Sequence, residues 1–379
     1  MNVNDLTDSE LSAFDDYDQH ERVRRIQDPE TGLVAFIGVH NRNLGPALGG
    51  CRMVPYMTEF DAIRDVLRLS RGMTYKNALA GLPLGGGKSV IIGDSHKIKT
   101  EELIRAMGRA VQAMGGRYIT AEDSGTSEQD MITIAGETEF VVGLPNEHVM
   151  EKSDTSNLGG NPSPITAQGV FIGIKAAVRK RYGSESLMGL KVAVQGMGAV
   201  GFDLARMLSE AGAEVIISDI REDVLDQVRS ELPDAHIMQP KHIFSADANV
   251  FAPCALGAQL NQETIPQMKF DIIAGAANNQ LATLEDEDRL ADKGILYVPD
   301  YAINSGGVIS VAYEYFHRIG RNPFTYPLNR DSMMGHLGQI SVTIEKIFAL
   351  SESEGITTGR AADRLAQSIF MKAKSGMSA

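Results

Sequence analysis

The sequence is poor in cysteine and lacks any histidine pattern suited to a metal. Among its 379 residues there are 2 cysteines, Cys51 and Cys254, which lie far apart in the chain. Such a pair excludes a disulfide framework and a cysteine-rich zinc site. The 8 histidines form no HExxH motif or other ligand spacing. We therefore expect no bound metal.

Positive charge and long apolar runs are also scarce. The chain has 36 Lys and Arg residues against 49 Asp and Glu, for a formal net charge of -13. Without a basic surplus to neutralise phosphates, nucleic acid and anionic membranes are poor partners. Residues 1–25 hold no apolar core of a signal peptide, and no apolar run is long enough to span a membrane. These absences suit a soluble cytoplasmic protein.

Length and composition predict two domains. A chain of 379 residues with 43% hydrophobic content can build two cores of ordinary size. Residues 141–146, VVGLPN, contain a glycine and a proline that interrupt regular secondary structure, and they are our hinge candidate. We expect a first α/β domain in residues 1–145, completed by residues 345–379, and a second domain in residues 146–344. We also expect a cleft between them.

The stretch from Met73 to Asp94, MTYKNALAGLPLGGGKSVIIGD, holds two lysines and a run of three glycines. Glycine loses more conformational entropy on folding than other residues, so a run of three indicates a backbone that must approach a ligand or another segment very closely. We interpret it as a loop that places Lys88 at a ligand. It does not match the phosphate loop of NTPases, because the first glycine stands at position 81 instead of 82 and a strand follows. A tight turn with a solvated lysine is the alternative.

Periodic patterns predict further elements of the first domain. They are a strand at residues 33–39, a glycine-rich loop at 44–53, and amphipathic helices at 59–73 and 101–114. In the second helix, Met107 and Met114 recur with the other apolar residues at helical spacing. We assign these methionines to the core.

A predicted strand at residues 117–121 ends in a polar turn that contains Asp123 and Ser124. Two interpretations stay open for this turn. Either Asp123 or Ser124 caps the N-terminus of a helix, or Asp123 is a catalytic acid–base group. The upstream lysines favour the second, because a nearby cation defines the charge of such a group.

The most specific motif follows a predicted buried strand at residues 190–195. It is GMGAVG, with Gly196, Gly198 and Gly201, and it precedes a helix and a second strand that ends at Asp219. In this setting GxGxxG indicates a doubly wound Rossmann domain that binds a dinucleotide. The glycines would let the backbone approach a pyrophosphate at a helix N-terminus.

The acid at the end of the second strand favours NAD over NADP. Asp219 would accept hydrogen bonds from the adenosine ribose hydroxyls and would repel a 2′-phosphate. Arg221 is close by in the sequence and keeps NADP open as an alternative. A glycine-rich turn that binds no ligand is the remaining alternative.

The second domain contains three further predicted strands, at residues 249–251, 271–274 and 295–298. A ligand lies across the carboxyl ends of the strands in an open parallel sheet, so the residues that follow should form walls around the nicotinamide. They include Cys254, Ala255, Asn278 and Asn279. We interpret Cys254 as a wall residue rather than a nucleophile, because no histidine accompanies it. We also expect helices at residues 166–182, 340–350 and 361–371.

Eight stretches, spread over roughly residues 20–312, carry a family likeness. They read LGPALGGCRM, RGMTYKNALAGLPLGGGKSVIIGD, RYITAED, GNPSPITAQG, VAVQGMGAVG, APCALGA, IAGAANNQL and PDYAINSGGVISV. In this order they resemble the glutamate, leucine, phenylalanine and valine dehydrogenase family, and its leucine branch most of all. The likeness weakens beyond Ala312, where aromatic residues are more frequent than it implies.

The resemblance implies an enzyme of two α/β domains, one for the substrate and oligomerisation and one for NAD. The implied reaction is reversible oxidative deamination of an L-amino acid to a 2-oxo acid and ammonia, in a homo-oligomer (dimer or octamer). By resemblance, Lys76 binds the substrate carboxylate, Lys88 activates water and Asp123 handles the amine proton. Gly49 and Met73 would line the substrate pocket.

The resemblance also implies which residues contact the side chain of the substrate and the cofactor. The matching positions are Leu48, Ala121, Val308 and Val311 for the side chain, Asn278 or Asn279 for the substrate or nicotinamide, and Thr166 for the carboxamide. We assign Asn279 to the substrate, and Asn278 to the cofactor together with the wall residues Cys254 and Ala255. Small aliphatic walls suit a branched side chain. One methylene changes binding by only about 1–3 kcal/mol, so leucine, valine and isoleucine should all react, with phenylalanine as the alternative.

Two other classes of function compete with this interpretation. A non-catalytic nucleotide sensor on the same fold would lack Lys76, Lys88 or Asp123, and all of them are present. A hydroxy-acid dehydrogenase would need a constellation of His or Arg residues that we do not find. Since Lys88 must be neutral part of the time to activate water, deamination should be faster at alkaline pH.

Overall fold

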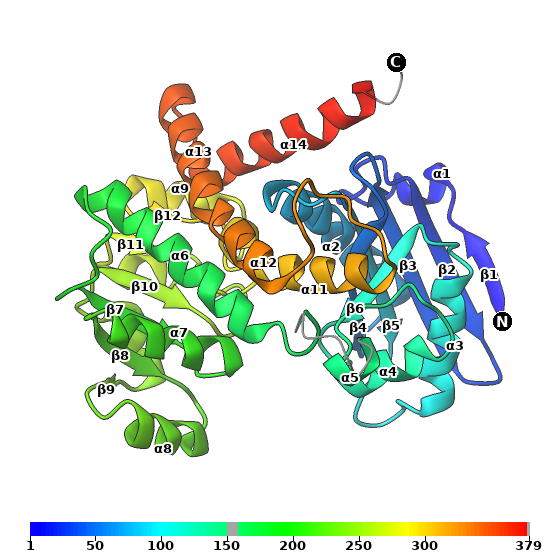
Figure 1. The fold of residues 1–379 in the computed structure, drawn as a ribbon, viewed down its shortest axis with the longest axis horizontal. Coiled ribbons are helices and arrows are strands. Elements are labelled where there is room, and N and C mark those ends of the chain that lie inside the picture. Colours follow the sequence, from blue (N-terminus) through cyan, green and yellow to red (C-terminus); the bar gives the residue numbers. More distant parts are fainter. Residues whose placement is uncertain (150–157, 377–379) are drawn as a thin grey trace. The chain divides into compact units, whose positions relative to one another are not determined.

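The computed structural model describes residues 1–149 and 158–376, which form two units (Figure 1). The first unit comprises Met1–Asn161, Ser310–Ser332 and Ala366–Ala379, and the second comprises Pro162–Ile309 and Met333–Leu365. Within the described ranges, no helix is long and apolar enough to cross a membrane. The same residues contain no group of three or more His, Cys, Asp or Glu placed to hold a metal ion.

The sheet of the first unit is mixed. From edge to edge its strands are β1 (Asn2–Asp5), β2 (Arg22–Asp28), β3 (Leu33–Asn41), β5 (Gly85–Ile92), β4 (Ala47–Val54) and β6 (Tyr118–Glu122). Antiparallel pairing joins β1, β2, β3 and β5, whereas β4 pairs in parallel with β5 and β6. The parallel half therefore brings three carboxyl ends toward one edge of the sheet.

Helices cover both faces of this sheet. They include α2 (Glu59–Leu79), α3 (Glu101–Gln112) and α4 (Glu128–Ala135), with the short α1 (Asp8–Leu11) and α5 (Asn146–Val149). Val66 of α2 packs with Val90 of β5, whereas the next strand residue, Ile91, packs with α3 and α4. Successive strand side chains point to opposite faces, so α2 lies on one face and the other two helices on the other. Met107 and Met114 are fully buried, which confirms their assignment to the core.

The two glycine-rich stretches of the first unit are strands, so the prediction of loops there is wrong. They form β4 and the start of β5. An added Cβ on Gly86 would collide with the backbone of Thr74 in α2, and one on Gly87 would lie 2.7 Å from the ring of Tyr118. The glycines allow a helix and a large ring to lie directly on the strand. The close approach that they indicate is therefore made by the chain itself.

The second unit contains a wholly parallel sheet. Its strands run in the order β12 (Leu296–Tyr297), β11 (Ile272–Ile273), β10 (Val250–Pro253), β7 (Lys191–Gln195), β8 (Glu214–Ser218) and β9 (His236–Ile237). The order reverses between β7 and β10, which is the doubly wound topology and the place where such sheets bind ligands. The predicted Rossmann arrangement is confirmed.

The helices of the second unit include those predicted at residues 166–182, at residues 340–350 and after the glycine motif, together with others that were not predicted. They are α6 (Ser163–Tyr182), α7 (Ala199–Glu210), α8 (Glu222–Glu231), α9 (Glu285–Asp292), α10 (Asp300–Ile303) and α13 (Gln339–Glu354), with 3-10 turns η1 (Pro240–Ser245) and η2 (Ile265–Gln267). A Cβ on Gly169 of α6 would lie 2.8 Å from the side chain of Ile340, so glycine lets α6 and α13 pack closely. Three helices contribute residues to both units: α11 (Gly306–Arg318), α12 (Arg330–Leu337) and α14 (Thr358–Gly376).

The aromatic-rich segment beyond the family-like stretches packs within the first unit. Tyr313 of α11 stacks on Phe324, which stacks on Tyr326, with ring centroids 5.1 and 5.2 Å apart. Next to this cluster, the carboxylate of Glu314 accepts a hydrogen bond from the backbone N–H of Gly143 at 2.8 Å. The C-terminal part of α11 is thereby tied to the predicted hinge residues.

Candidate active site

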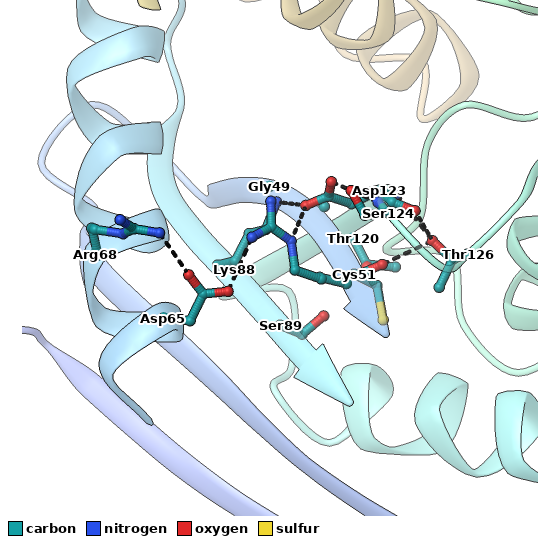
Figure 2. A network of polar contacts seen from close by, with 12 residues as sticks. Gly49, Cys51, Asp65, Arg68, Lys88, Ser89, Thr120, Asp123, Ser124 and Thr126 are labelled. Atoms are coloured by element: carbon teal, nitrogen blue, oxygen red, sulfur yellow. Dashed lines mark hydrogen bonds and ion pairs between the residues drawn. The ribbon is translucent and has the colours of Figure 1, made fainter. Parts of the chain in front are cut away.

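Lys88 and Asp123 form a largely buried ion pair (Figure 2). Lys88 lies in β5 and is 7% exposed, and Asp123 follows the last residue of β6. Nζ of Lys88 donates to Oδ2 of Asp123, 35 positions away in the chain. Strand β4 pairs with both of these strands and places Gly50 between them. The parallel register therefore brings together the two residues predicted to be catalytic.

Glycine at position 50 leaves room for this pair. A Cβ on Gly50 would lie 2.8 Å from the Cβ of Asp123 and 3.2 Å from Nζ of Lys88. The neighbouring Gly49 is equally constrained, because its Cβ would approach Cγ of Met73 to 3.1 Å. The predicted pocket residues Gly49 and Met73 are thus in contact.

A polar turn holds Asp123 against β4. The backbone N–H of Asp123 donates to Oγ1 of Thr126 at 3.0 Å, and that hydroxyl donates to the carbonyl of Cys51 at 2.8 Å. The N-cap of the following helix α4 is Ser127. Of the two interpretations left open for this turn, the helix cap at Asp123 or Ser124 is therefore wrong.

Neighbouring charges keep the carboxyl group of Asp123 ionised. Burial raises the pKa of Asp123, but Lys88 and Arg52 lower it by more, so that it lies well below its usual range. The backbone N–H of Ser124 also donates to Oδ1 at 2.7 Å. A carboxylate beside an ammonium group can exchange a proton with a bound molecule, so the pair suits acid–base chemistry.

Arg52 and Asp65 extend this network, and the sequence analysis missed both. Nη1 of Arg52 donates to Oδ2 of Asp65 at 3.0 Å, and Asp65 also accepts from Tyr56 at 2.6 Å. Arg68 donates to Asp65 as well, at 3.1 Å (Figure 2). A signal was present in the stretch GGCRM, where Arg52 follows Gly50 by two positions. Alternate residues of a strand share a face, so a strand assignment would have pointed Arg52 toward the ion pair.

The other predicted substrate residues of the first unit lie in α2, β4 and β6. Met73 and Lys76 are about one turn apart in α2. Leu48 in β4 is buried, and Ala121 in β6 pairs with Gly50. The structure therefore places Leu48 on the strand between β5 and β6, Ala121 two residues before Asp123, and Met73 and Lys76 on the helix that packs on β5.

Two predicted wall residues lie in α11 and one cofactor residue in α6. Val308 and Val311 are buried and about one turn apart; Val308 belongs to the second unit and Val311 to the first. Thr166 donates from Oγ1 to the carbonyl of Pro162 at 3.0 Å. A Cβ on Gly307 would lie 2.7 Å from that hydroxyl, so Thr166 stands beside the start of α11.

The GxGxxG motif forms a tight turn between β7 and α7. Gly196 has a φ of +93°, which favours glycine, and its Cβ would lie 2.8 Å from the Cβ of Ala255. A Cβ on Gly201 would collide with the carbonyl of Gly196, so α7 packs closely on the turn. Gly198 is the N-cap of α7, where no described side chain caps the helix and an added Cβ would meet open space. This terminus suits a phosphate.

Asp219 lies just beyond β8 with its carboxylate tied to the glycine turn. Oδ2 accepts from the backbone N–H of Met197 at 2.7 Å, and Oδ1 accepts from that of Arg221 at 2.8 Å. Burial raises the pKa of Asp219, but these two amides and the Arg221 side chain lower it by more. Each carboxylate oxygen keeps a second lone pair, so Asp219 can still accept a bond from a hydroxyl group.

Residues that follow β10 and β11 gather at the carboxyl edge of the sheet. Oδ1 of Asn278 accepts from Asn304 at 2.8 Å, and the carbonyl of Asn279, at a φ of +51°, accepts from the backbone N–H of Ala258 at 2.7 Å. Burial raises the pKa of the Cys254 thiol to about 12. A protonated thiol is a poor nucleophile, which favours a wall residue at this position.

The donor set of this edge fits a nicotinamide dinucleotide. The uncapped N-terminus of α7 suits the pyrophosphate and Asp219 suits the ribose. Among the described residues, buried oxygens of Gln195, Ser218 and Asn304 have no hydrogen-bond partner. Gln195 and Ser218 end β7 and β8. Polar groups left without partners at the carboxyl ends of two strands indicate a place for a ligand.

Comparison with known proteins finds relatives along most of the chain. Residues 20–140 match the family model "Glu/Leu/Phe/Val dehydrogenase, dimerisation domain", and residues 218–348 match "Glutamate/Leucine/Phenylalanine/Valine dehydrogenase". A leucine dehydrogenase from Geobacillus stearothermophilus is 47% identical over 358 residues, which cover 94% of this chain and 92% of the relative. A phenylalanine dehydrogenase from Bacillus thermotolerans is 41% identical over 373 residues, covering 97% and 93%.

A solved structure shares the fold at similar identity. The crystal structure of L-tryptophan dehydrogenase from Nostoc punctiforme has a TM-score of 0.78 and 42% identity, covering 94% of this chain and 97% of that chain. Sequence and fold agree with the glycine turn and the strand order described above. The chain therefore belongs to the Glu/Leu/Phe/Val dehydrogenase family of amino acid dehydrogenases, which use a nicotinamide cofactor.

Proposed function

We propose that this protein catalyses the reversible, NAD-dependent oxidative deamination of branched-chain L-amino acids, with leucine as the main substrate, to the 2-oxo acid and ammonia. The observation that carries the proposal is the Lys88–Asp123 ion pair, for which Gly50 leaves the space. The 47% identity to a leucine dehydrogenase over 94% of the chain supports the choice of substrate.

The first unit supplies the charged groups of the proposed reaction. Lys76 binds the carboxylate of the amino acid as a cationic hydrogen-bond donor. Lys88, once neutral, removes a proton from the water that attacks the imino carbon. Asp123 takes up and returns the proton of the substrate amine. NAD, when bound, accepts the hydride from the α-carbon.

The second unit supplies the proposed binding site for NAD. Gly196 and Gly198 leave the turn open for the pyrophosphate at the N-terminus of α7. Asp219 binds the ribose hydroxyls and disfavours a 2′-phosphate, which selects NAD over NADP. Thr166 and Asn278 orient the carboxamide of the nicotinamide.

We also propose a cytoplasmic homo-oligomer, at least a dimer. The match of residues 20–140 to a model described as a dimerisation domain supports self-association through the first unit. The formal charge of -13 supports a small-molecule enzyme rather than a partner of nucleic acid or anionic membranes.

A panel of L-amino acids with NAD tests the proposed function. We expect kcat/KM for leucine, valine and isoleucine to agree within about 10–200-fold, because one methylene changes binding by about 1–3 kcal/mol. Phenylalanine should react more slowly, and glutamate more slowly still, because the predicted side-chain positions are aliphatic and offer no cation to a second carboxylate. These positions are Leu48, Ala121, Val308 and Val311.

The outcomes of this panel show whether an error lies in the proposed substrate or in the proposed class of enzyme. NADH formation with phenylalanine above leucine would reject the aliphatic walls but keep an amino acid dehydrogenase. No NADH formation with any L-amino acid would reject the function. If only a 2-hydroxy acid reacts with NAD, the protein is a hydroxy-acid dehydrogenase and the proposed function is wrong.

Gly50→Ala should lower kcat by about 10²-fold, because a Cβ at this position moves Asp123 and a misplacement of about 1 Å costs roughly that factor. The matched control is Gly72→Ala in α2, where an added Cβ meets no atom within 4 Å. This control should keep wild-type activity and gain about 0.5–1 kcal/mol of stability, seen as a higher unfolding midpoint. Wild-type kcat in Gly50→Ala would contradict the packing argument.

A further inference from the structure

Arg52 stands between two carboxylates, of which one belongs to the proposed reaction. Its Nη1 donates to Oδ2 of Asp65 at 3.0 Å, and its Nε lies 3.5 Å from Oδ2 of Asp123. Nε is buried and makes no hydrogen bond to any described residue. The guanidinium therefore faces Asp123 as a positive charge at ion-pair distance, without clamping its oxygen in a hydrogen bond.

Asp65 holds this guanidinium in place. Its side chain is 12% exposed and also accepts from Tyr56 at 2.6 Å and from Arg68 at 3.1 Å. Burial lowers the pKa of Arg52, but Asp123 and Asp65 raise it by more. Arg52 thus stays a cation, and the negative charge of Asp65 offsets part of the positive charge that reaches Asp123.

We propose that Arg52 is a positioning residue that holds Asp123 as a carboxylate directed at Lys88. Asp65 determines how much of the positive charge of Arg52 acts on the Lys88–Asp123 pair. This inference rests on the proposed function. Removing the charge of Arg52 should make the Lys88–Asp123 pair hold its proton to higher pH. Removing the charge of Asp65 should make the pair release that proton at lower pH. Two neutral substitutions in one network should therefore act in opposite directions.

Tyr56 loses its acceptor in Asp65→Asn, but burial, the largest cause, still raises its pKa. The other titratable groups near the pair are unchanged in all variants. Cys51 and Tyr118 are buried beside β5, and burial raises the pKa of both, to about 12 for Cys51. Burial and nearby carboxylates also raise the pKa of Glu122. Lys99 and Asp130 neutralise each other at 2.8 Å. A difference between variants therefore reports the substituted charge.

The pH profile of kcat/KM for L-leucine with NAD tests the inference. The acid-side limb should move to higher pH in Arg52→Gln and to lower pH in Asp65→Asn, each by about half a pH unit or more. Arg52→Lys keeps the charge but loses the planar fork, so its limb should stay near the wild-type position while kcat falls. Arg64→Gln is the matched control on α2, with a 59% exposed side chain, and should change neither.

A second readout needs no substrate. With a carbon-13 label at Cε of lysine, the NMR shift of Lys88, assigned through Lys88→Met, follows its loss of a proton with pH. The titration should move in the same two directions in Arg52→Gln and Asp65→Asn. Unmoved titrations, or titrations that move in one direction, would overturn the role of Arg52. If Arg52→Gln does not fold, the downward shift in Asp65→Asn decides.

The two readouts keep this inference distinct from the proposed function. If the wild-type protein converts no amino acid, the proposed function fails, and the NMR titration still decides whether Arg52 and Asp65 tune the pair. If the wild-type protein converts leucine and neither readout moves, only the role of Arg52 fails.

Discussion

Lys88→Met should lower kcat/KM for L-leucine by about 10²–10⁴-fold, the usual contribution of a general base. Methionine keeps an unbranched stem but has no nitrogen to take a proton from water. The protein should stay folded, because Asp123 keeps Arg52 at 3.5 Å and the amide of Ser124 at 2.7 Å, so its buried charge is not left unpaired. Initial rates with NAD measure the loss of activity, and the thermal unfolding midpoint shows whether the protein stays folded.

The matched control for this change is Lys97→Met. Lys97 has a 76% exposed side chain and pairs with Asp94, and exposed pairs contribute only about 0–1 kcal/mol. Activity and unfolding midpoint should both match the wild type. Full activity in Lys88→Met would rule out Lys88 as the base, whatever the substrate proves to be.

Asp219→Asn should lower the ratio of kcat/KM with NAD to kcat/KM with NADP by about 10² or more. The loss of hydrogen bonds to a charged acceptor costs about 1.5–3 kcal/mol with NAD. With NADP, the repulsion of a 2′-phosphate disappears at the same time, and like charges in contact cost several kcal/mol. The side chain of Arg221, 3.6 Å from Oδ1, is then free to meet the phosphate.

The ratio distinguishes recognition from distortion of the turn. Asp219 also accepts from the amides of Met197 and Arg221, and a distorted turn would weaken both cofactors alike. Asp226→Asn, on α8 with a 71% exposed side chain, is the matched control and should leave the ratio unchanged. An unchanged ratio in Asp219→Asn would remove the basis for NAD selection at this residue.

Local sequence pattern was sufficient for much of the second unit. The strand before Gly196, the turn, the helix and the strand before Asp219 all occur as predicted. Each depends on residues that are neighbours in the chain: an apolar run for a buried strand, glycines for a tight turn, and helical spacing for α7. These elements can be predicted without knowing which distant residues pack on them.

Local pattern failed for the glycine-rich stretches of the first unit. Glycine disfavours strands, so residues 44–53 and the start of β5 were expected to be loops. The packing of α2 on Gly86 overrides that preference, because a side chain there would collide with Thr74. Arg52 was missed for the same reason. Its position in a strand fixes which face of the sheet its side chain points to, and a loop assignment does not.

The sequence by itself determined the family, the two-domain α/β class, the glycine turn, and the candidates Lys88 and Asp123. Only the tertiary structure decided that Lys88 pairs with Asp123, that Gly50 makes room for them, and that Arg52 and Asp65 join the network. These contacts depend on the order β5, β4, β6 and on its register, which pair residues far apart in the chain. A slip of one residue would turn every side chain to the opposite face, and Gly86 and Gly87 would no longer lie where Thr74 and Tyr118 leave room only for glycine.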